Sequence, residues 1–340
     1  MVFASATSLI ICVKRLLSGK NKHMDMNDTP LRSQEEAEHL ASSLPPLLAQ
    51  ADRVAHTVMQ GLHGRRRTGV GEAFWQFRQY QPGDMSNRID WRKSARSDTL
   101  LIRENEWEAA NTVWIWCDQS ASMDFKSDLA NTTKSERSIL LSLALTVLLV
   151  RGGERIGILG NDLPPATGQR IVQRMASILL NRQEIENPAL LSLPPRTEMP
   201  RFSTAVFLSD FLEPVEQLIE RLSTLATSDV TGHLVQILDP AEETLPYFGR
   251  TEFSGMEDDT RLTVGKAETL QSEFADKMSQ HRAQIADLAS RLGWTYTLHR
   301  TDDTAQSALL KLYGLLGDNA ALRGVIGSGA AHLSSTAGGH

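Results

Sequence analysis

Cysteine is almost absent from this chain of 340 residues, where it occurs only at Cys12 and Cys117. Two cysteines cannot form a disulfide framework or a metal site built mainly from cysteine, so no oxidising compartment is required. Cys117 stands inside an apolar run, and we expect it to be a small buried side chain. A cytoplasmic location is the expectation that follows.

Long hydrophobic runs are also missing. The most apolar stretch, residues 139–150, is shorter than the roughly 20 residues that a membrane-spanning helix needs. Ser142 and Thr146 interrupt it, and Arg137 and Arg151 flank it. This pattern predicts a core helix that packs on a sheet, and we expect no membrane span.

The beginning of the chain does not have the pattern of a secretory signal. Residues 8–13 are apolar, but Lys14 and Arg15 follow them instead of preceding them. We interpret residues 1–33 as a poorly ordered segment, with Met24 or Met26 as alternative initiators.

Positive charge is scarce overall, with a formal net charge of −6, which argues against a general nucleic-acid-binding protein. Residues 64–103 are the exception, because nine basic and four acidic residues give this segment a net charge of +5. Its arginines either pair with its own aspartates, as a structural block, or form a face that binds carboxylate or phosphate groups.

Several catalytic signatures are absent. The nine histidines show no metal-ligand spacing of the His-x-x-x-His kind. The chain has no P-loop, no Ser-His-Asp order and no Cys-His pair. These absences exclude the commonest nucleotide-binding, hydrolase and zinc-dependent chemistries that a sequence reveals.

The most informative stretch is residues 113–123, Val-Trp-Ile-Trp-Cys-Asp-Gln-Ser-Ala-Ser-Met. Its apolar half predicts a strand buried on both faces, as in a parallel α/β sheet. Asp118, Ser120 and Ser122 follow at alternate positions, where such sheets place their ligands. A carboxylate and two hydroxyls are the hard oxygen donors that Mg²⁺ prefers. The bland alternative is an ordinary turn.

A second apolar strand, residues 204–209, ends in Asp210. Strands and helices alternate from residue 113 onward, which predicts an α/β fold with a doubly wound, mostly parallel sheet. Two carboxylates at adjacent strand ends raise each other's pKa unless a cation lies between them. We therefore expect Asp118 and Asp210 to converge on one oxygen-only site. The expected strands are 100–103, 113–117, 156–159, 204–209, 233–238, 251–254, 261–264 and 294–298. The expected helical segments are 34–61, which Pro45 and Pro46 divide into two pieces, 135–151, 169–181, 213–226, 266–292 and 304–316.

Five blocks of the chain together resemble the bacterial domain of unknown function 58 family, whose members are similar to von Willebrand factor A (vWA) domains. They contain the family-motif residues Tyr80, Gly83, Asp84, Arg88, Asp90, Trp91, Arg96 and Asp239, together with Asp118, Ser120, Ser122 and Asp210. The resemblance covers about residues 61–316. It implies a vWA-like fold with an amino-terminal helical and irregular/β extension.

The resemblance also implies site residues and a partner. Asp118, Ser120 and Ser122 would form the first loop of a metal-ion-dependent adhesion site, and Asp210 would belong to a later loop. Thr167 is the candidate for the threonine of the middle loop, with Asp162 or a water as alternatives. The ion would be Mg²⁺, or Mn²⁺ or Ca²⁺. The expected protein partner is a MoxR-type AAA+ ATPase that offers an Asp or Glu carboxylate.

The resulting division of the chain has four parts. Residues 1–33 form the amino-terminal segment, and residues 34–110 form an extension with a helix and the Arg/aromatic-rich block. Residues 111–316 form the vWA-like domain, and residues 317–340 form a disordered tail. We expect the extension to pack on the sheet, because its Arg/aromatic-rich block has too few large apolar side chains to fold alone.

Three functions are compatible with these residues. The first, which we favour, is a non-enzymatic, metal-dependent protein-interaction module. The second is a divalent-metal-dependent phosphohydrolase, but the position two residues after Asp118, where haloacid-dehalogenase-like enzymes place an acid/base aspartate, is Ser120. The third is an anion-binding protein that uses residues 65–96.

Overall fold

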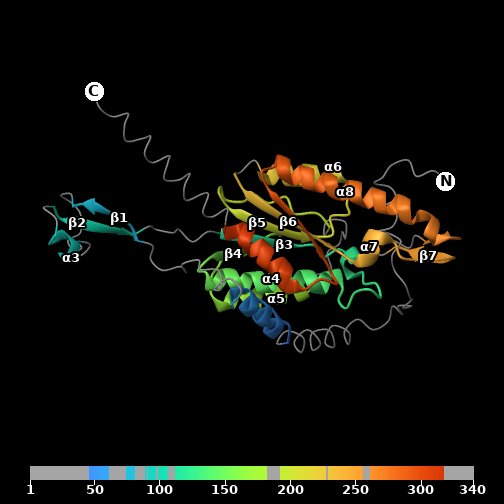
Figure 1. The fold of residues 1–340 in the computed structure, drawn as a ribbon, viewed down its shortest axis with the longest axis horizontal. Coiled ribbons are helices and arrows are strands. Elements are labelled where there is room, and N and C mark those ends of the chain that lie inside the picture. Colours follow the sequence, from blue (N-terminus) through green and yellow to red (C-terminus); the bar gives the residue numbers. More distant parts are fainter. Residues whose placement is uncertain are drawn as a thin grey trace, which may run out of the picture. The chain divides into compact units, whose positions relative to one another are not determined.

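The computed structural model describes residues 46–60, 74–80, 89, 91–96, 99–105, 112–181, 192–226, 229–255 and 261–317 (Figure 1). The chain divides into two compact units. Residues 61–111 form the smaller unit, and residues 1–60 with residues 112–340 form the larger one. The expected amino-terminal segment 1–33 and nearly all of the expected tail lie outside the described residues.

The larger unit is built on a five-stranded sheet with the strand order β4-β3-β5-β6-β9. All four strand pairs are parallel. The chain forms β3 first, continues to β4 on one side and then to β5 on the other, so the topological switch point lies between β3 and β5. The strands are β3 (Thr112–Cys117), β4 (Arg155–Ile158), β5 (Thr204–Ser209), β6 (Thr231–Leu238) and β9 (Thr295–Arg300).

Helices cover both faces of this sheet, which confirms the predicted doubly wound α/β fold (Figure 1). On one face lie α4 (Lys134–Arg151) and α5 (Gln169–Leu180). On the other lie α6 (Val215–Ala226) and α8 (Gln271–Arg291), which begins after the short 3₁₀ helix η4 (Ala267–Leu270). The chain also forms helices at residues 46–60 and 305–317.

Helix α4 has clear start and stop signals. The Thr133 hydroxyl accepts a hydrogen bond from the Glu136 amide, and the Glu136 carboxylate accepts one from the Thr133 amide. This capping box satisfies two amides that the first turn leaves without partners. After Arg151 the chain turns at Gly153, whose φ of +84° suits glycine. Asp52, in the helix of residues 46–60, pairs with Arg151 at 2.5 Å.

Aromatic packing fills the core between the sheet and helices α6 and α8. The ring of Phe207 on β5 stacks on Trp294, with centroids 5.6 Å apart. Gly232 on β6 allows the Trp294 ring to lie against the strand, because a Cβ at this position would be 2.1 Å from the ring. The indole of Trp294 donates to the Val230 carbonyl at 2.9 Å, so its polar atom is satisfied although buried.

Beyond β6, the short helix α7 (Pro240–Thr244) leads to an antiparallel hairpin of β7 (Thr251–Ser254) and β8 (Arg261–Val264). The sequence predicted this hairpin, and its acidic connection at residues 257–259 lies outside the described residues.

The smaller unit contains an antiparallel pair, β1 (Phe74–Gln79) and β2 (Leu101–Asn105), and the short helix α3 (Trp91–Ser94). The sequence predicted β2 but neither β1 nor α3. The Ser94 hydroxyl accepts a hydrogen bond from the Leu101 amide at 2.8 Å, which joins α3 to β2.

The family-motif residues of this unit are only partly described. The Tyr80 amide donates to the Leu100 carbonyl at 2.8 Å, which continues the β1–β2 pairing. Trp91 is 63% exposed, and Arg96 is exposed. The remaining four, Gly83, Asp84, Arg88 and Asp90, lie outside the described residues, so the expected packing and pairing of this block stay predictions.

Among the described residues, none of the helices combines the length and the apolar composition required to cross a bilayer.

The burial of His299 on β9 leads to a prediction about pH. Burial, reinforced by the charge of Arg137, lowers the pKa of His299 from 6.5 to about 4. At a pH between these two pKa values, His299 is protonated in the unfolded chain but not in the folded protein, so acid destabilises the fold. Lowering the pH from 7 to 5 should therefore cost about 2 kcal/mol through this group.

Urea unfolding of the wild type and His299→Gln between pH 5 and pH 7 measures this contribution. The variant should lose less unfolding free energy than the wild type over this range. His56→Gln, at an exposed histidine, is the control substitution. If His299→Gln lost as much unfolding free energy between pH 7 and pH 5 as the wild type, the prediction would be wrong.

Candidate metal centre

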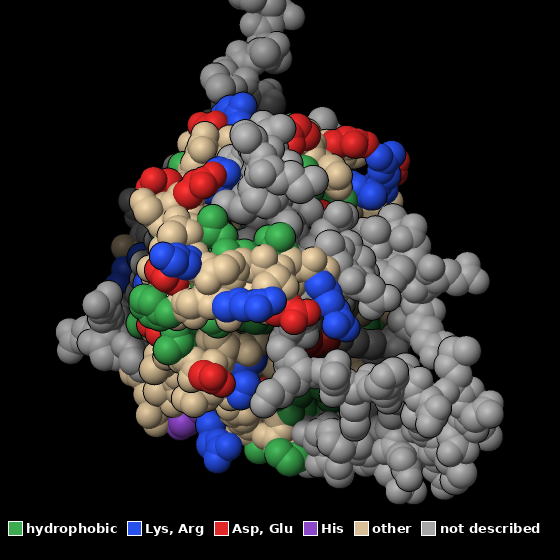
Figure 2. Space-filling view, turned by 90° about the vertical axis from the view of Figure 1, so that its right-hand side faces the viewer, with side chains coloured by type: hydrophobic (Ala, Val, Ile, Leu, Met, Phe, Trp, Pro, Cys, Tyr) green, Lys and Arg blue, Asp and Glu red, His purple; other side chains and the backbone are tan. Residues whose placement is uncertain are grey.

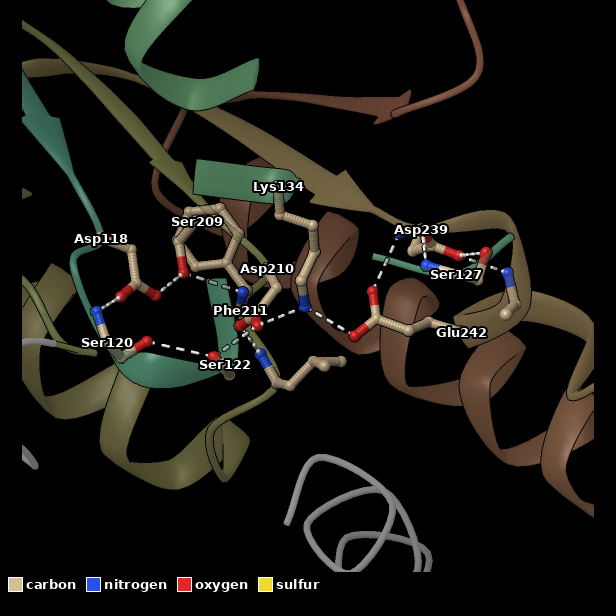
Figure 3. A network of polar contacts seen from close by, with 12 residues as sticks. Asp118, Ser120, Ser122, Ser127, Lys134, Ser209, Asp210, Phe211, Asp239 and Glu242 are labelled. Atoms are coloured by element: carbon tan, nitrogen blue, oxygen red, sulfur yellow. Dashed lines mark hydrogen bonds and ion pairs between the residues drawn. The ribbon is translucent and has the colours of Figure 1, made fainter. Parts of the chain in front are cut away.

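The candidate site lies at the switch point, at the carboxyl ends of the adjacent strands β3 and β5 (Figure 3). Asp118 directly follows β3, and Asp210 directly follows β5. The Asp118 amide donates to the Leu208 carbonyl at 2.9 Å, so the parallel pairing continues to the edge of the site. Parallel pairing thus brings together two carboxylates that are far apart in the sequence.

Asp118 accepts hydrogen bonds from two serines. Its Oδ1 accepts a hydrogen bond from the Ser120 amide at 2.8 Å, and its Oδ2 accepts one from the Ser209 hydroxyl at 2.6 Å. Asp118 is 2% exposed. The first bond is an Asx-type turn that directs the chain into the 3₁₀ helix η2 (Ala121–Asp124), and the second ties the β3 loop to the end of β5.

The two loops are also joined by serine hydroxyls. Ser122 donates to Asp210 Oδ2 at 2.8 Å, and its oxygen lies 3.0 Å from the hydroxyl oxygen of Ser120. Since the single Ser122 proton points to Asp210, Ser120 is the donor in the second bond. The structure therefore brings together four of the five predicted ligands, which are Asp118, Ser120, Ser122 and Asp210.

The Asp210 loop is fixed by its own backbone contacts. Asp210 Oδ1 accepts from the Leu212 amide at 3.1 Å, and the Asp210 carbonyl accepts from the Gln236 amide group at 2.6 Å. Phe211 has a φ of +48°, which is uncommon for a residue other than glycine, and His281 contacts its carbonyl at 2.7 Å. These contacts from β6 and α8 hold the loop in a sharp turn that directs the Asp210 carboxylate towards Ser122.

The fifth predicted ligand, Thr167, lies elsewhere. Its neighbour Ala166 pairs antiparallel with Ile156 of β4, and Ile156 pairs with Val113 at the start of β3. Asp118 follows Val113 by five residues, which corresponds to about 16 Å along a strand. Thr167 is also exposed. The structure thus places Thr167 towards the amino end of the sheet, because the chain doubles back beside β4 before it enters α5.

Lys134 was not anticipated from the sequence. It opens α4 and is fully buried, and its ammonium group lies 2.8 Å from Asp210 Oδ2 and 2.6 Å from Glu242 Oε1 (Figure 3). A lysine in the first turn of a helix opposes the helix dipole, so it needs an acidic partner there. That local mismatch is the only signal in the sequence that points to this residue.

Burial and charge act in opposite directions on this pair. Burial lowers the pKa of Lys134, but Asp210 and Glu242 outweigh it, so the pKa is raised and the ammonium form is stabilised. Burial raises the pKa of Glu242 to about 7, although Lys134 acts to lower it. Asp210 contributes to this rise, since two carboxylates share the one ammonium group.

Asp239, the last family-motif residue, has a structural role. It caps α7 by accepting from the Ala241 amide at 2.9 Å, and the Glu242 side chain completes the capping box. It also accepts from the Ser127 amide at 2.9 Å and from the Ser127 hydroxyl at 2.5 Å. Asp239 therefore ties the loop between β3 and α4 to α7, and it positions the helix that carries Glu242.

Comparisons with known proteins identify the family. Residues 76–284 match the model of the family described as "Protein of unknown function DUF58". The chain belongs to this family. Two uncharacterized relatives, Rv1480 of Mycobacterium tuberculosis and Mb1516 of Mycobacterium bovis, are each 26% identical to it over 283 residues. The match covers 80% of this DUF58 protein and 88% of each relative.

Two solved structures are similar to parts of this DUF58 protein. One is the conserved hypothetical protein BatB from Bacteroides thetaiotaomicron, with 14% identity, a TM-score of 0.35, and coverage of 62% of this chain and 100% of that one. The other is an aerotolerance-related membrane protein from Bacteroides fragilis, with 16% identity, a TM-score of 0.33, and coverage of 59% and 95%.

The donor set fits one hard divalent cation on the Asp118 side of the cluster. Asp118, Ser120 and Ser122 supply carboxylate and hydroxyl oxygens, which are suitable ligands for Mg²⁺. Asp210 already pairs with Lys134, so an ion clamped evenly between both aspartates does not fit. Among the described residues, no group of three or more His, Cys, Asp or Glu side chains could hold a metal. Asp162 or water would therefore have to complete the coordination.

Proposed function

We propose that this protein is a non-enzymatic, metal-dependent interaction module of the vWA-like type. Asp118, Ser120 and Ser122 are the residues that would hold Mg²⁺, or Mn²⁺ or Ca²⁺. The observation that carries the proposal is the hydrogen bond from Ser122 to Asp210, which joins the two strand-end loops into one oxygen-rich cluster.

Each side chain has a defined role in this proposal. Asp118 supplies the negative charge, and its two hydrogen bonds from Ser120 and Ser209 fix its orientation. Ser122 donates a hydrogen bond to Asp210 and accepts one from Ser120, so one of its lone pairs remains available for a bound ion. A bound ion would supply a coordination position that a carboxylate from another protein can take.

The surroundings of Asp118 support binding over catalysis. The position that an acid/base carboxylate would need is occupied by Ser120, whose hydroxyl hydrogen-bonds to Ser122. On the face shown in Figure 2, basic and acidic side chains of the described residues are interspersed instead of grouped by sign. That face gives no support to a nucleic-acid-binding function.

The partner in this proposal is a protein with an exposed Asp or Glu side chain, acting in the cytoplasm. The family resemblance favours a MoxR-type AAA+ ATPase, with this chain in a chaperone-like or assembly role.

Titration of the purified full chain with Mn²⁺, by calorimetry, tests the metal site. The wild type should bind one ion. Asp118→Asn and the double variant Ser120→Ala/Ser122→Ala should each weaken binding about tenfold or more, because the first removes a negative charge and the second removes two hydroxyl oxygens. Asp128→Asn is the matched control, since Asp128 is an exposed carboxylate on the same loop.

Circular dichroism should show that the variants remain folded, which matters because Ser120 and Ser122 are 1% and 2% exposed. The proposal would be refuted by a folded wild type that binds no Mn²⁺, or by Mn²⁺ affinity that all these substitutions leave unchanged.

A further inference from the structure

We infer that Lys134 sets the charge of the candidate metal site, by placing one buried positive charge beside Asp210. This inference rests on the proposed function and extends it to a residue that does not itself bind the ion. Its consequence is that Lys134 weakens the binding of the divalent ion and strengthens the attraction of that ion for an external carboxylate.

The first step is the geometry of the shared oxygen. Asp210 Oδ2 accepts both the ammonium group of Lys134 and the hydroxyl group of Ser122, each at 2.8 Å (Figure 3). The lysine charge is therefore one hydrogen bond away from a candidate ligand. Asp118, on the other side of Ser120 and Ser122, accepts hydrogen bonds from neutral donors. The lysine charge thus acts on the site through Asp210.

The second step is that the ammonium group is held in place. Lys134 is fully buried at the first turn of α4, and its Nζ lies 6.0 Å from the centroid of the Phe125 ring. Glu242 binds the ammonium from the side opposite Asp210, and the α7 capping box fixes Glu242 in turn. The ammonium group is thus held between Asp210 and Glu242 of α7, and it cannot leave the site as a solvated counter-ion could.

The third step is the charge balance. Lys134 supplies one positive charge beside the three carboxylates of Asp118, Asp210 and Glu242, so a divalent ion there meets one negative charge fewer than it would without the lysine. An ion in that state attracts the carboxylate of a partner more strongly, while its own affinity for the site is lower.

The experiment compares Mn²⁺ affinities of full-length variants by calorimetry. Lys134→Met should bind Mn²⁺ at least about tenfold more tightly than the wild type, because one nearby charge shifts an ionic equilibrium by an order of magnitude or more. Glu242→Gln leaves the Lys134 charge to act on Asp210 alone, so it should bind Mn²⁺ more weakly. Lys126→Met, at an exposed lysine of the same loop, is the matched control and should keep the wild-type affinity.

Acetate serves as the probe for an external carboxylate. Its binding to the Mn²⁺-loaded protein is followed by the loss of the water-proton relaxation that the bound ion produces. The wild type should take up acetate at lower concentration than Lys134→Met does, so metal affinity and acetate affinity should change in opposite directions. A change of both affinities in the same direction would overturn the inference.

The outcomes separate this inference from the proposed function. A wild type that binds no Mn²⁺ overturns both. Binding that depends on Asp118 but stays within about twofold in Lys134→Met and Glu242→Gln overturns only the role of Lys134. If Lys134→Met does not fold, the Mn²⁺ affinity of Glu242→Gln decides the question, because glutamine keeps the size and one oxygen of Glu242 while removing its charge.

Discussion

Replacing Lys134 by methionine is expected to lower the free energy of unfolding by about 3–5 kcal/mol, because the change leaves Asp210 and Glu242 buried without their cation. Lys134 has no exposed surface and makes both ion pairs at 2.8 Å or less. Urea unfolding monitored by circular dichroism measures the loss. The double variant Lys134→Met/Glu242→Gln should recover part of it, since one of the two buried charges is then absent.

A surface ion pair provides the control for this prediction. Arg291 and Asp287 pair at 3.0 Å on α8, and both side chains are more than 60% exposed. Arg291→Met should cost no more than about 0.5 kcal/mol, as is typical of exposed pairs four residues apart on a helix. If Lys134→Met were as mild as Arg291→Met, the ion pairs of Lys134 would have no stabilising role.

Replacing Phe207 by alanine is expected to lower the free energy of unfolding by about 3–5 kcal/mol. Phe207 lies at the centre of β5 with no exposed surface, and its ring centroid is 5.6 Å from that of Trp294 and 6.3 Å from that of Trp116. Truncation would leave a cavity between two large rings, which cannot move together easily because each is fixed by its own strand or loop.

The size of the cavity can be tested with graded variants in urea unfolding. Phe207→Leu retains most of the side-chain volume and should cost less than half as much as Phe207→Ala. Phe248→Ala changes a side chain that is 75% exposed and should be nearly neutral, within about 0.5 kcal/mol. Equal losses for Phe207→Ala and Phe248→Ala would show that the packing between the sheet and α8 does not limit stability.

The two parts of the candidate site differ in how far local sequence determines them. Asp118, Ser120 and Ser122 are close in the sequence and directly follow an apolar strand, so their common location follows from the strand itself. Asp210 could be added because it ends the next strong strand, and parallel strands that pair at a switch point present their carboxyl ends side by side.

The sequence alone determined the alternation of strands and helices, because apolar periodicity and helix caps are local properties of the chain. It thereby determined the doubly wound α/β fold and the edge of the sheet that carries the polar residues. The sequence could not place Thr167, because the path of a loop depends on which strand it passes. Here Ala166 pairs antiparallel with Ile156 of β4. Only the tertiary structure decided that Lys134 pairs with Asp210 and Glu242. Their contact depends on how α4 and α7 are set on the sheet, and a buried lysine differs from a surface lysine only in the partners that the fold brings to it.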